Sequence, residues 1–224
     1  MKKDINIQIN TSYHTLNELT EHTKNIWVVC HGYGQLAEYF IQKFACLPPQ
    51  ENFIIAPQAL SKFYISGFSG RVGATWMTKR DRETEVGNYV NMISNIFARE
   101  TQGADLGKYR VILFGFSQGT ATITRFAMQS GIHFHHLILW AGSFPHDANF
   151  EEASGMLSDK KFDFLMGNQD EFYNQKRIDE HIAMLKEQNI YPQLTIFEGE
   201  HKVYDDVLLN LDIWHAWALA FSIL

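Results

Sequence analysis

The amino-acid sequence predicts an α/β fold in which a mostly parallel central sheet carries helices on both faces. Two observations support this fold class: short, mainly apolar runs recur along the chain, and helical patterns separate most of them. A short run with little polar interruption is typical of a strand that is covered on both sides. Strands that alternate with helices pair in parallel, because each helix carries the chain back across the sheet.

Each element can be placed by its hydrophobic period. Residues 5–13 alternate apolar and polar side chains, which indicates a half-exposed strand. The other expected strands are the apolar runs at residues 26–30, 53–56, 111–114, 137–140, 162–166 and 194–197. A helical period appears near residues 36–46, 84–100, 118–129 and 173–188.

Two further segments are expected to be loops, and a third is expected to be a terminal helix. Residues 58–75 and 143–158 fit neither period, so we expect loops there, at the edge of the sheet that carries the functional residues. Residues 207–224 form a mainly apolar run of the minimum length for a membrane span. Polar residues such as Asp212 and His215 interrupt that run, so we expect a terminal helix that packs on the domain.

The composition is that of an ordinary globular protein. Hydrophobic residues make up 46% of the 224 residues and charged residues 20%, which excludes disordered and fibrous classes. A chain of this length buries roughly 72% of its unfolded surface, so its core needs no disulfide or metal. No repeat, linker or low-complexity tract divides the chain, and we expect one domain over residues 1–224.

Charge and cysteine content exclude further classes. The net charge is -6 and no cluster of Lys and Arg is visible, which argues against nucleic-acid binding. The two cysteines, Cys30 and Cys46, provide neither a disulfide framework nor a Cys-x-x-Cys site. The alternating segment after Lys2 and Lys3 cannot serve as the apolar core of a signal peptide. We therefore expect a cytoplasmic protein without stable membrane insertion.

The run Gly115-Phe116-Ser117-Gln118-Gly119 carries the most information about chemistry, because it directly follows an expected strand and opens an expected helix. In this context Gly-x-Ser-x-Gly forms a tight turn that projects the serine hydroxyl above the sheet. The glycines are required because a Cβ atom at either flank would clash with the neighbouring strand or helix. The alternative is a strand-to-helix turn that contains a serine by coincidence. The strand and helix around the motif favour a nucleophile.

A serine hydroxyl is a poor nucleophile at neutral pH and needs a base and an orienting acid later in the chain. Asp170 lies in the segment just after one expected strand, and His201 just after the next. Because the carboxyl ends of parallel strands meet at one edge, Ser117, Asp170 and His201 are expected to lie together. Asp163 lies within a strand and Asp179 within a helix, so Asp170 is the expected acid.

The negative charge that develops on an attacked carbonyl oxygen needs hydrogen-bond donors. The segment His31-Gly32-Tyr33-Gly34 follows an expected strand, and its glycines let backbone N–H groups turn toward the cleft. We assign the backbone N–H groups of Tyr33 and Gln118 as the oxyanion hole. His31 is expected to fix this segment by hydrogen bonds rather than to act in catalysis.

Five motifs follow one another along the chain: His31-Gly32-Tyr33-Gly34, Gly115-Phe116-Ser117-Gln118-Gly119, Ala141-Gly142-Ser143-Phe144-Pro145, Gly167-Asn168-Gln169-Asp170 and Gly199-Glu200-His201. In order and spacing they resemble those of the phospholipase/carboxylesterase family of α/β-hydrolases, which includes acyl-protein thioesterases. The resemblance extends from residue 26 to the last helix. It implies an α/β-hydrolase fold and hydrolysis of a small-molecule ester or thioester by Ser117, His201 and Asp170. It also implies that no metal or organic cofactor takes part.

Two positions depart from the family pattern. Thioesterase members favour an Asp after the His-Gly-x-Gly turn and a further Gly after Gly119. This chain has Gln35 and Thr120 at those positions. The departures argue against deacylation of proteins.

An aromatic segment interrupted by glycines suggests where substrate binds. Residues 62–76 include Phe63, Tyr64, Phe68 and Trp76, which we expect to form an apolar, mobile wall for an acyl or alcohol group. The alternative is an ordinary surface loop whose aromatic side chains pack downward. The sequence shows no obvious large lid or interfacial helix, so we expect substrates with short to medium acyl chains.

Two other functions are compatible with the sequence. A noncatalytic protein of the same fold would bind a small ligand in the cleft, although the order of Ser117, Asp170 and His201 argues against it. An acyltransferase that uses the same serine is the other alternative, since His201 followed by Asp205 or Asp206 matches short acyltransferase patterns. A helix start with acidic residues in its first turns explains the two aspartates more simply.

The sequence also contains a cluster of histidines that could bind a metal. His133, His135 and His136 lie close together but have no Asp, Glu or Cys at the usual metal-site spacing. We expect a polar turn there and no metal site.

Overall fold

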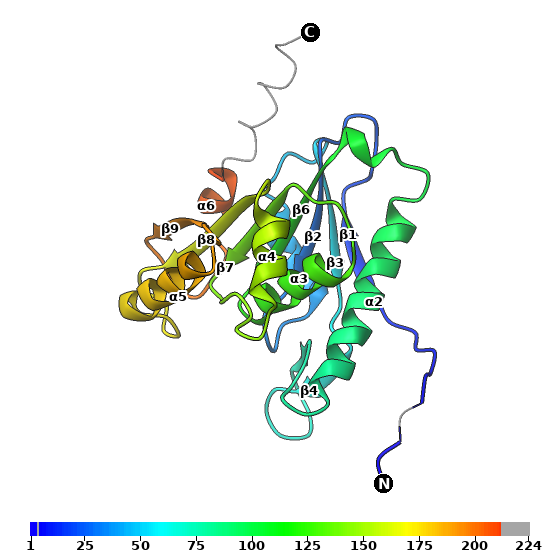
Figure 1. Cartoon of the computed structure of the whole chain (residues 1–224). Coiled ribbons are helices and arrows are strands. Elements are labelled where there is room, and N and C mark those ends of the chain that lie inside the picture. The colour runs from blue at the N-terminus through cyan, green and yellow to red at the C-terminus, as the bar shows by residue number, and fades with distance from the viewer. Residues whose placement is uncertain (4, 212–224) are drawn as a thin grey trace.

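The computed structural model describes residues 1–3 and 5–211, and within them a sheet of seven strands runs in the order β1-β3-β2-β6-β7-β8-β9 (Figure 1). Neighbouring strands are parallel except β1, which is antiparallel to β3. The strands are β1 (Tyr13–Leu16), β2 (Asn25–Cys30), β3 (Asn52–Pro57), β6 (Arg110–Phe116), β7 (His136–Trp140), β8 (Lys161–Gly167) and β9 (Gln193–Phe197).

Helices pack on both faces of this sheet, and each face has its own hydrophobic core. One face is covered by α2 (Arg82–Glu100), α3 (Gln118–Gln129), α4 (Phe150–Leu157) and α5 (Gln175–Glu187) (Figure 1). The other face is covered by α1 (Ala37–Phe40), the 3-10 helix η1 (Ile41–Phe44) and α6 (Asp205–Leu209). A second 3-10 helix, η2 (Leu106–Lys108), lies between α2 and β6.

Strand β2, which lies inside the sheet between β3 and β6, shows why the sheet is buried on both sides. Ile26 and Val28 point into the core beneath α2 and α3, whereas Trp27 and Val29 point into the core beneath α1 and η1. All residues of β2 are buried. The strand therefore has no solvent-exposed face, which is the pattern of a parallel strand between two helical layers. The predicted fold class is confirmed.

One segment expected as a loop is an antiparallel hairpin. Within residues 58–75, β4 (Ser61–Tyr64) pairs with β5 (Val72–Thr75), and the turn between them holds Gly67 and Gly70 at positive φ. Such φ values suit glycine, because it has no Cβ atom. Three of the four residues of β4 are exposed, so the hairpin lacks the apolar pattern that reveals a buried strand.

The other segment expected as a loop, residues 143–158, contains the helix α4. At eight residues this helix is too short for a clear hydrophobic period. Its start does carry a sequence signal: Asn149 is followed three residues later by Glu152. The Asn149 side chain accepts a hydrogen bond from the Glu152 N–H at 3.3 Å and so caps the helix.

The first strand is shorter than expected, and part of the expected terminal helix lies outside the described residues. β1 begins at Tyr13, and residues 5–12 belong to no strand, with Ile5, Ile7 and Ile9 exposed. Of the expected terminal helix, α6 is present, whereas residues 212–224 lie outside the described residues. In the described part of the chain, no helix is both long and apolar enough to cross a membrane.

Candidate active site

The predicted catalytic residues lie at the carboxyl edge of the parallel sheet. Ser117 follows β6, Asp170 follows β8 and His201 follows β9. The segment of residues 31–35, expected to provide an oxyanion donor, follows β2. These strands run in the same direction, so the segments after them meet at one edge.

Ser117 occupies a strained turn between β6 and α3. Its φ of 54° and ψ of -118° lie outside the regions that a serine ordinarily adopts. Its N–H donates to the Trp140 carbonyl of β7 at 2.9 Å, which holds the turn against the sheet. A Cβ on Gly119 would collide with the Cys30 carbonyl, and one on Gly115 with the backbone of α3. The motif therefore adopts a tight strand-to-helix turn, here called the elbow, as its sequence context predicts.

Asp170 orients the imidazole of His201. The distance from Asp170 Oδ2 to His201 Nδ1 is 2.7 Å. The other carboxylate oxygen, Oδ1, accepts the Phe172 N–H at 2.8 Å, and the Asp170 side chain is fully buried. A carboxylate at Nδ1 keeps the proton on that nitrogen, which leaves Nε2 as a proton acceptor.

The loops after β8 and β9 are hydrogen-bonded to each other, which fixes the distance between Asp170 and His201. The N–H of Asn168 donates to the Phe197 carbonyl at 2.9 Å, and that of Gln169 donates to the Gly199 carbonyl at 2.9 Å. The Asn168 side chain accepts the Gly199 N–H at 3.2 Å. Three hydrogen bonds therefore join the loop that carries Asp170 to the loop that carries His201.

Two phenylalanines pack on His201. The Phe116 ring centroid lies 4.9 Å from that of the imidazole, and the Phe172 ring meets it edge-on at 4.7 Å. Phe172 is 55% exposed, so its ring covers the imidazole from the solvent side. Phe172 was not among the predicted site residues, although it lies two residues after the expected acid Asp170.

A pocket of about 370 Å³ brings the expected nucleophile and the expected base together. Ser117 and His201 both line it, and so do Gln35 and Tyr173, neither of which was expected to be a wall residue. The Gln35 side chain accepts the Gly32 N–H at 2.8 Å and so stabilises the loop after β2. The full lining is Gly32, Tyr33, Gln35, Phe116, Ser117, Phe172, Tyr173 and His201.

The backbone of the loop after β2 leaves one N–H group available. The N–H of Gly34 donates to the Ala74 carbonyl at 2.8 Å, and that of Gln35 donates to the Gly32 carbonyl at 3.2 Å. The N–H groups of Tyr33 and Gln118 have no acceptor within residues 1–3 and 5–211. Gln118 is the first residue of α3, where the N–H groups point out of the helix.

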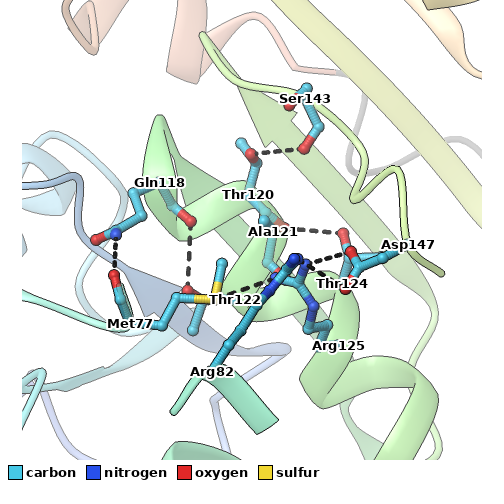
Figure 2. Close-up of polar contacts among 10 residues, drawn as sticks. All are labelled: Met77, Arg82, Gln118, Thr120, Ala121, Thr122, Thr124, Arg125, Ser143 and Asp147. Carbon is cyan, nitrogen blue, oxygen red and sulfur yellow. Dashed lines mark hydrogen bonds and ion pairs between the residues drawn. The ribbon is translucent and has the colours of Figure 1, made fainter. Parts of the chain in front are cut away.

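Thr120 anchors the start of α3, and Figure 2 shows its contact with Ser143. The Thr120 hydroxyl contacts the Ser117 carbonyl at 2.7 Å and the Ser143 carbonyl at 2.9 Å. This is the position where thioesterase members were expected to have glycine. The hydroxyl links the elbow to the segment that follows β7.

An ion cluster lies further along the same helix (Figure 2). Asp147 accepts from Arg125 of α3 at 2.5 Å and from Arg82 of α2 at 2.7 Å. Burial alone would raise the pKa of Asp147, but the hydrogen bond and charge of Arg125, with the charge of Arg82, lower it. The two arginines therefore keep a carboxylate ionised between α2, α3 and the segment before α4.

The four aromatic residues expected to form a substrate wall occupy different environments. Phe63 packs against Tyr33, with the two rings tilted by 32° and their centroids 5.1 Å apart, and so lies beside the pocket. Tyr64 is half exposed and Phe68 is 98% exposed, at the hairpin and its tip. Trp76 is buried, and its indole N–H donates to the His31 carbonyl at 2.8 Å. Trp76 thus belongs to the core and not to a mobile wall, because the hydrogen bond and burial hold its ring inside.

His31 is buried and makes the structural contacts that were expected. Its Nδ1 lies 2.8 Å from the Gly32 carbonyl, and its Nε2 accepts the Ala59 N–H at 3.3 Å. These contacts require the neutral ring with its proton on Nδ1. Burial lowers the pKa of His31 from 6.5 to about 4, and the hydrogen bond to Gly32 offsets only part of that effect.

A depressed histidine pKa predicts a loss of stability in acid. Because the folded-state pKa lies below the unfolded value, the contribution is complete above about pH 6.5 and is lost as pH falls toward 4. His31 alone should lower the free energy of unfolding by about 2 kcal/mol between pH 7 and pH 5. His31→Asn cannot take up that proton, so urea unfolding at both pH values should show a smaller loss. Equal losses in the two proteins would contradict this prediction.

The histidine cluster is divided between separate contacts. His136 is the first residue of β7, and its Nε2 lies 2.7 Å from Asp163 Oδ2, with both side chains buried. His135 Nδ1 accepts the Val111 N–H at 3.1 Å. Among the described residues, no group of three or more His, Cys, Asp or Glu side chains is arranged to hold a metal. Asp163 is engaged with His136 and not with His201.

Solved structures of esterases have a similar fold. Acyl-protein thioesterase 2 from Zea mays matches with a TM-score of 0.65 and 18% identity, over 89% of this chain and 95% of that one. Esterase PE8 matches with a TM-score of 0.58 and 20% identity, over 89% and 95% of the two chains. A carboxylesterase from Mesorhizobium loti has a TM-score of 0.64 and 14% identity, over 88% and 91%. These similarities establish the fold.

A family comparison identifies the sequence more closely. No curated protein matches the chain. A family model described as phospholipase/carboxylesterase matches residues 13–209, which is most of the chain. The match begins with β1, ends with α6 and contains all the strands and catalytic candidates described above. The chain therefore belongs to the phospholipase/carboxylesterase family of α/β-hydrolases.

Proposed function

We propose that the protein is a serine hydrolase that cleaves carboxylic esters, with thioesters as a second substrate class, through an acyl-enzyme. The observation that carries the proposal is the arrangement at the carboxyl edge of the sheet. A 2.7 Å contact between Asp170 and His201 orients the imidazole in the pocket that Ser117 also lines. A strained serine, an oriented histidine and a buried carboxylate are the three parts that nucleophilic acyl transfer requires.

In the acylation step, the Ser117 hydroxyl attacks the carbonyl carbon of the ester. His201 Nε2 takes the hydroxyl proton, and the buried Asp170 stabilises the imidazolium that results. The N–H groups of Tyr33 and Gln118 donate to the oxyanion of the tetrahedral intermediate. The imidazolium then returns the proton to the leaving alcohol or thiol, and the acyl group stays on Ser117.

In the deacylation step, water replaces the alcohol. His201 takes a proton from the water as it attacks the acyl carbon, and the same oxyanion donors stabilise the second tetrahedral intermediate. Return of the proton to Ser117 releases the carboxylic acid. Phe172 and Phe116 both pack on the imidazole, which favours one ring position for both steps.

The pocket favours small acyl groups. Its volume of about 370 Å³ is at the lower end for small-molecule sites, and aromatic rings supply much of its wall. We therefore propose that short and medium acyl chains are the preferred substrates.

A panel of p-nitrophenyl esters with graded acyl length tests this preference. We expect kcat/KM to be highest from acetate to octanoate and to fall by about tenfold or more at palmitate, because further methylenes find no buried surface. Matched thioesters show whether the second substrate class is used. Faster turnover of long-chain triglyceride emulsions than of soluble butyrate esters would contradict the preference.

A further inference from the structure

The end of the hairpin, residues 73–77, contacts the loop that carries one proposed oxyanion donor. Ala74 accepts the Gly34 N–H at 2.8 Å and donates its own N–H to the Gln35 carbonyl at 3.2 Å. Trp76 adds the hydrogen bond from its indole to the His31 carbonyl at 2.8 Å. Three hydrogen bonds on both sides of Tyr33 therefore hold its loop against residues 73–77.

The same segment contacts the residue that carries the other donor. The side-chain oxygen of Gln118 accepts the Trp76 N–H at 3.1 Å. Its side-chain nitrogen donates to the Thr75 hydroxyl at 2.9 Å and to the Met77 carbonyl at 3.0 Å; Figure 2 shows the contact with Met77. Both amide protons and the amide oxygen are therefore paired with three consecutive residues of one segment.

We infer that the Gln118 side chain is a positioning residue, which acts through residues 73–77 to set the distance between the Tyr33 and Gln118 N–H groups. The inference rests on the proposed function, in which only the backbone N–H of Gln118 takes part. It assigns a role to the side chain of the same residue. The two donors come from loops after different strands, β2 and β6. Residues 73–77 bond to both loops, and each bond lies within three residues of a donor.

Positioning of this kind is expected to affect the transition state more than the substrate. An oxyanion donor acts where the negative charge develops, and a displacement of about 1 Å costs up to about 100-fold in rate. Gln118 starts α3, and the first N–H groups of a helix have no partner within the helix to hold them. Its side chain supplies the restraint that the backbone at this position lacks.

Gln118→Met tests the inference, because methionine keeps the length of the side chain and removes the three hydrogen bonds. For p-nitrophenyl acetate we expect kcat to fall about 10- to 100-fold and KM to stay within about threefold. An alkylboronic acid forms a tetrahedral adduct with a catalytic serine and mimics the intermediate. Its Ki should rise by the same factor as kcat falls.

The matched control is Gln129→Met, which makes the same change at the exposed last residue of the same helix. It should leave kcat, KM and Ki unchanged. Rates are referred to the concentration of active sites titrated with a fluorophosphonate, so that loss of folded protein does not count as loss of kcat.

A second pair of variants decides the question if Gln118→Met does not fold. Thr75→Val removes the hydroxyl that accepts from Gln118, whereas Thr75→Ser keeps it. We expect Thr75→Val to lower kcat and boronate affinity together by about 3- to 10-fold, and Thr75→Ser to restore both. A merely structural role would lower the melting temperature and leave both quantities at their wild-type values.

The outcomes separate this inference from the proposed function. A folded Gln118→Met enzyme whose kcat and Ki stay within threefold of wild type overturns the inference while Ser117 remains the nucleophile. Failure of a fluorophosphonate to label wild-type Ser117 overturns the proposed function, and the inference with it. A parallel loss of kcat and boronate affinity, absent from Gln129→Met, supports the inference.

Discussion

Ser117→Ala should lower kcat for p-nitrophenyl acetate by roughly 10⁴-fold or more, because no other group in the pocket replaces an alkoxide at the elbow. The change removes one oxygen atom, and alanine has the same Cβ atom as serine, so the strained turn should persist. A melting temperature close to that of the wild type checks this point. Residual turnover slightly above the rate in water is expected from the oxyanion donors and from binding.

Ser158→Ala is the control for that experiment. Ser158 is an exposed residue at the end of α4, and its hydroxyl donates to the nearby Gly155 carbonyl. Its removal should leave kcat unchanged. If folded Ser117→Ala kept more than about a tenth of wild-type activity, the nucleophile would have to be another group.

Asp170→Asn should keep the fold and lower kcat by roughly 10⁴-fold. An asparagine amide facing His201 Nδ1 donates a proton where the carboxylate accepts one, so the imidazole adopts the tautomer with its proton on Nε2. That ring cannot take the proton of Ser117. The loss should appear in kcat/KM, because the general base of the free enzyme is affected.

Asp179→Asn makes the same substitution where the structure gives it no catalytic contact. Asp179 lies on α5, is exposed and accepts a hydrogen bond from Gln175 at 2.8 Å. This variant should have nearly the wild-type kcat. Purified, folded Asp170→Asn with activity within about tenfold of wild type would show that another carboxylate orients His201.

The sequence predicts the central strands well because burial on both faces leaves few polar positions. In β2 and β3 all residues are buried, so a short apolar run identifies the strand without help from its neighbours. The hairpin and α4 are different. β4 is mostly exposed and α4 has eight residues, so neither produces a period long enough to detect.

The spatial proximity of the catalytic candidates was predictable, because parallel strands place their carboxyl ends at one edge of the sheet. The structure brings Asp170 within hydrogen-bond distance of His201 and places Ser117 in the same pocket. Side-chain packing between distant segments was not predictable. The burial of Trp76 beneath His31 and the contact of Phe172 with His201 depend on tertiary structure, and no local pattern encodes them.

The most direct test of the proposed function is the site at which a fluorophosphonate binds to the wild-type protein. The probe reacts with an activated serine and forms a stable adduct, which tryptic digestion and tandem mass spectrometry assign to one residue. We expect a single adduct on Ser117, formed on the folded enzyme and lost after heat denaturation, since the proposed mechanism needs the strained turn and the Asp170–His201 pair to activate that serine. An adduct on any other residue, or no adduct on the folded protein, would contradict it.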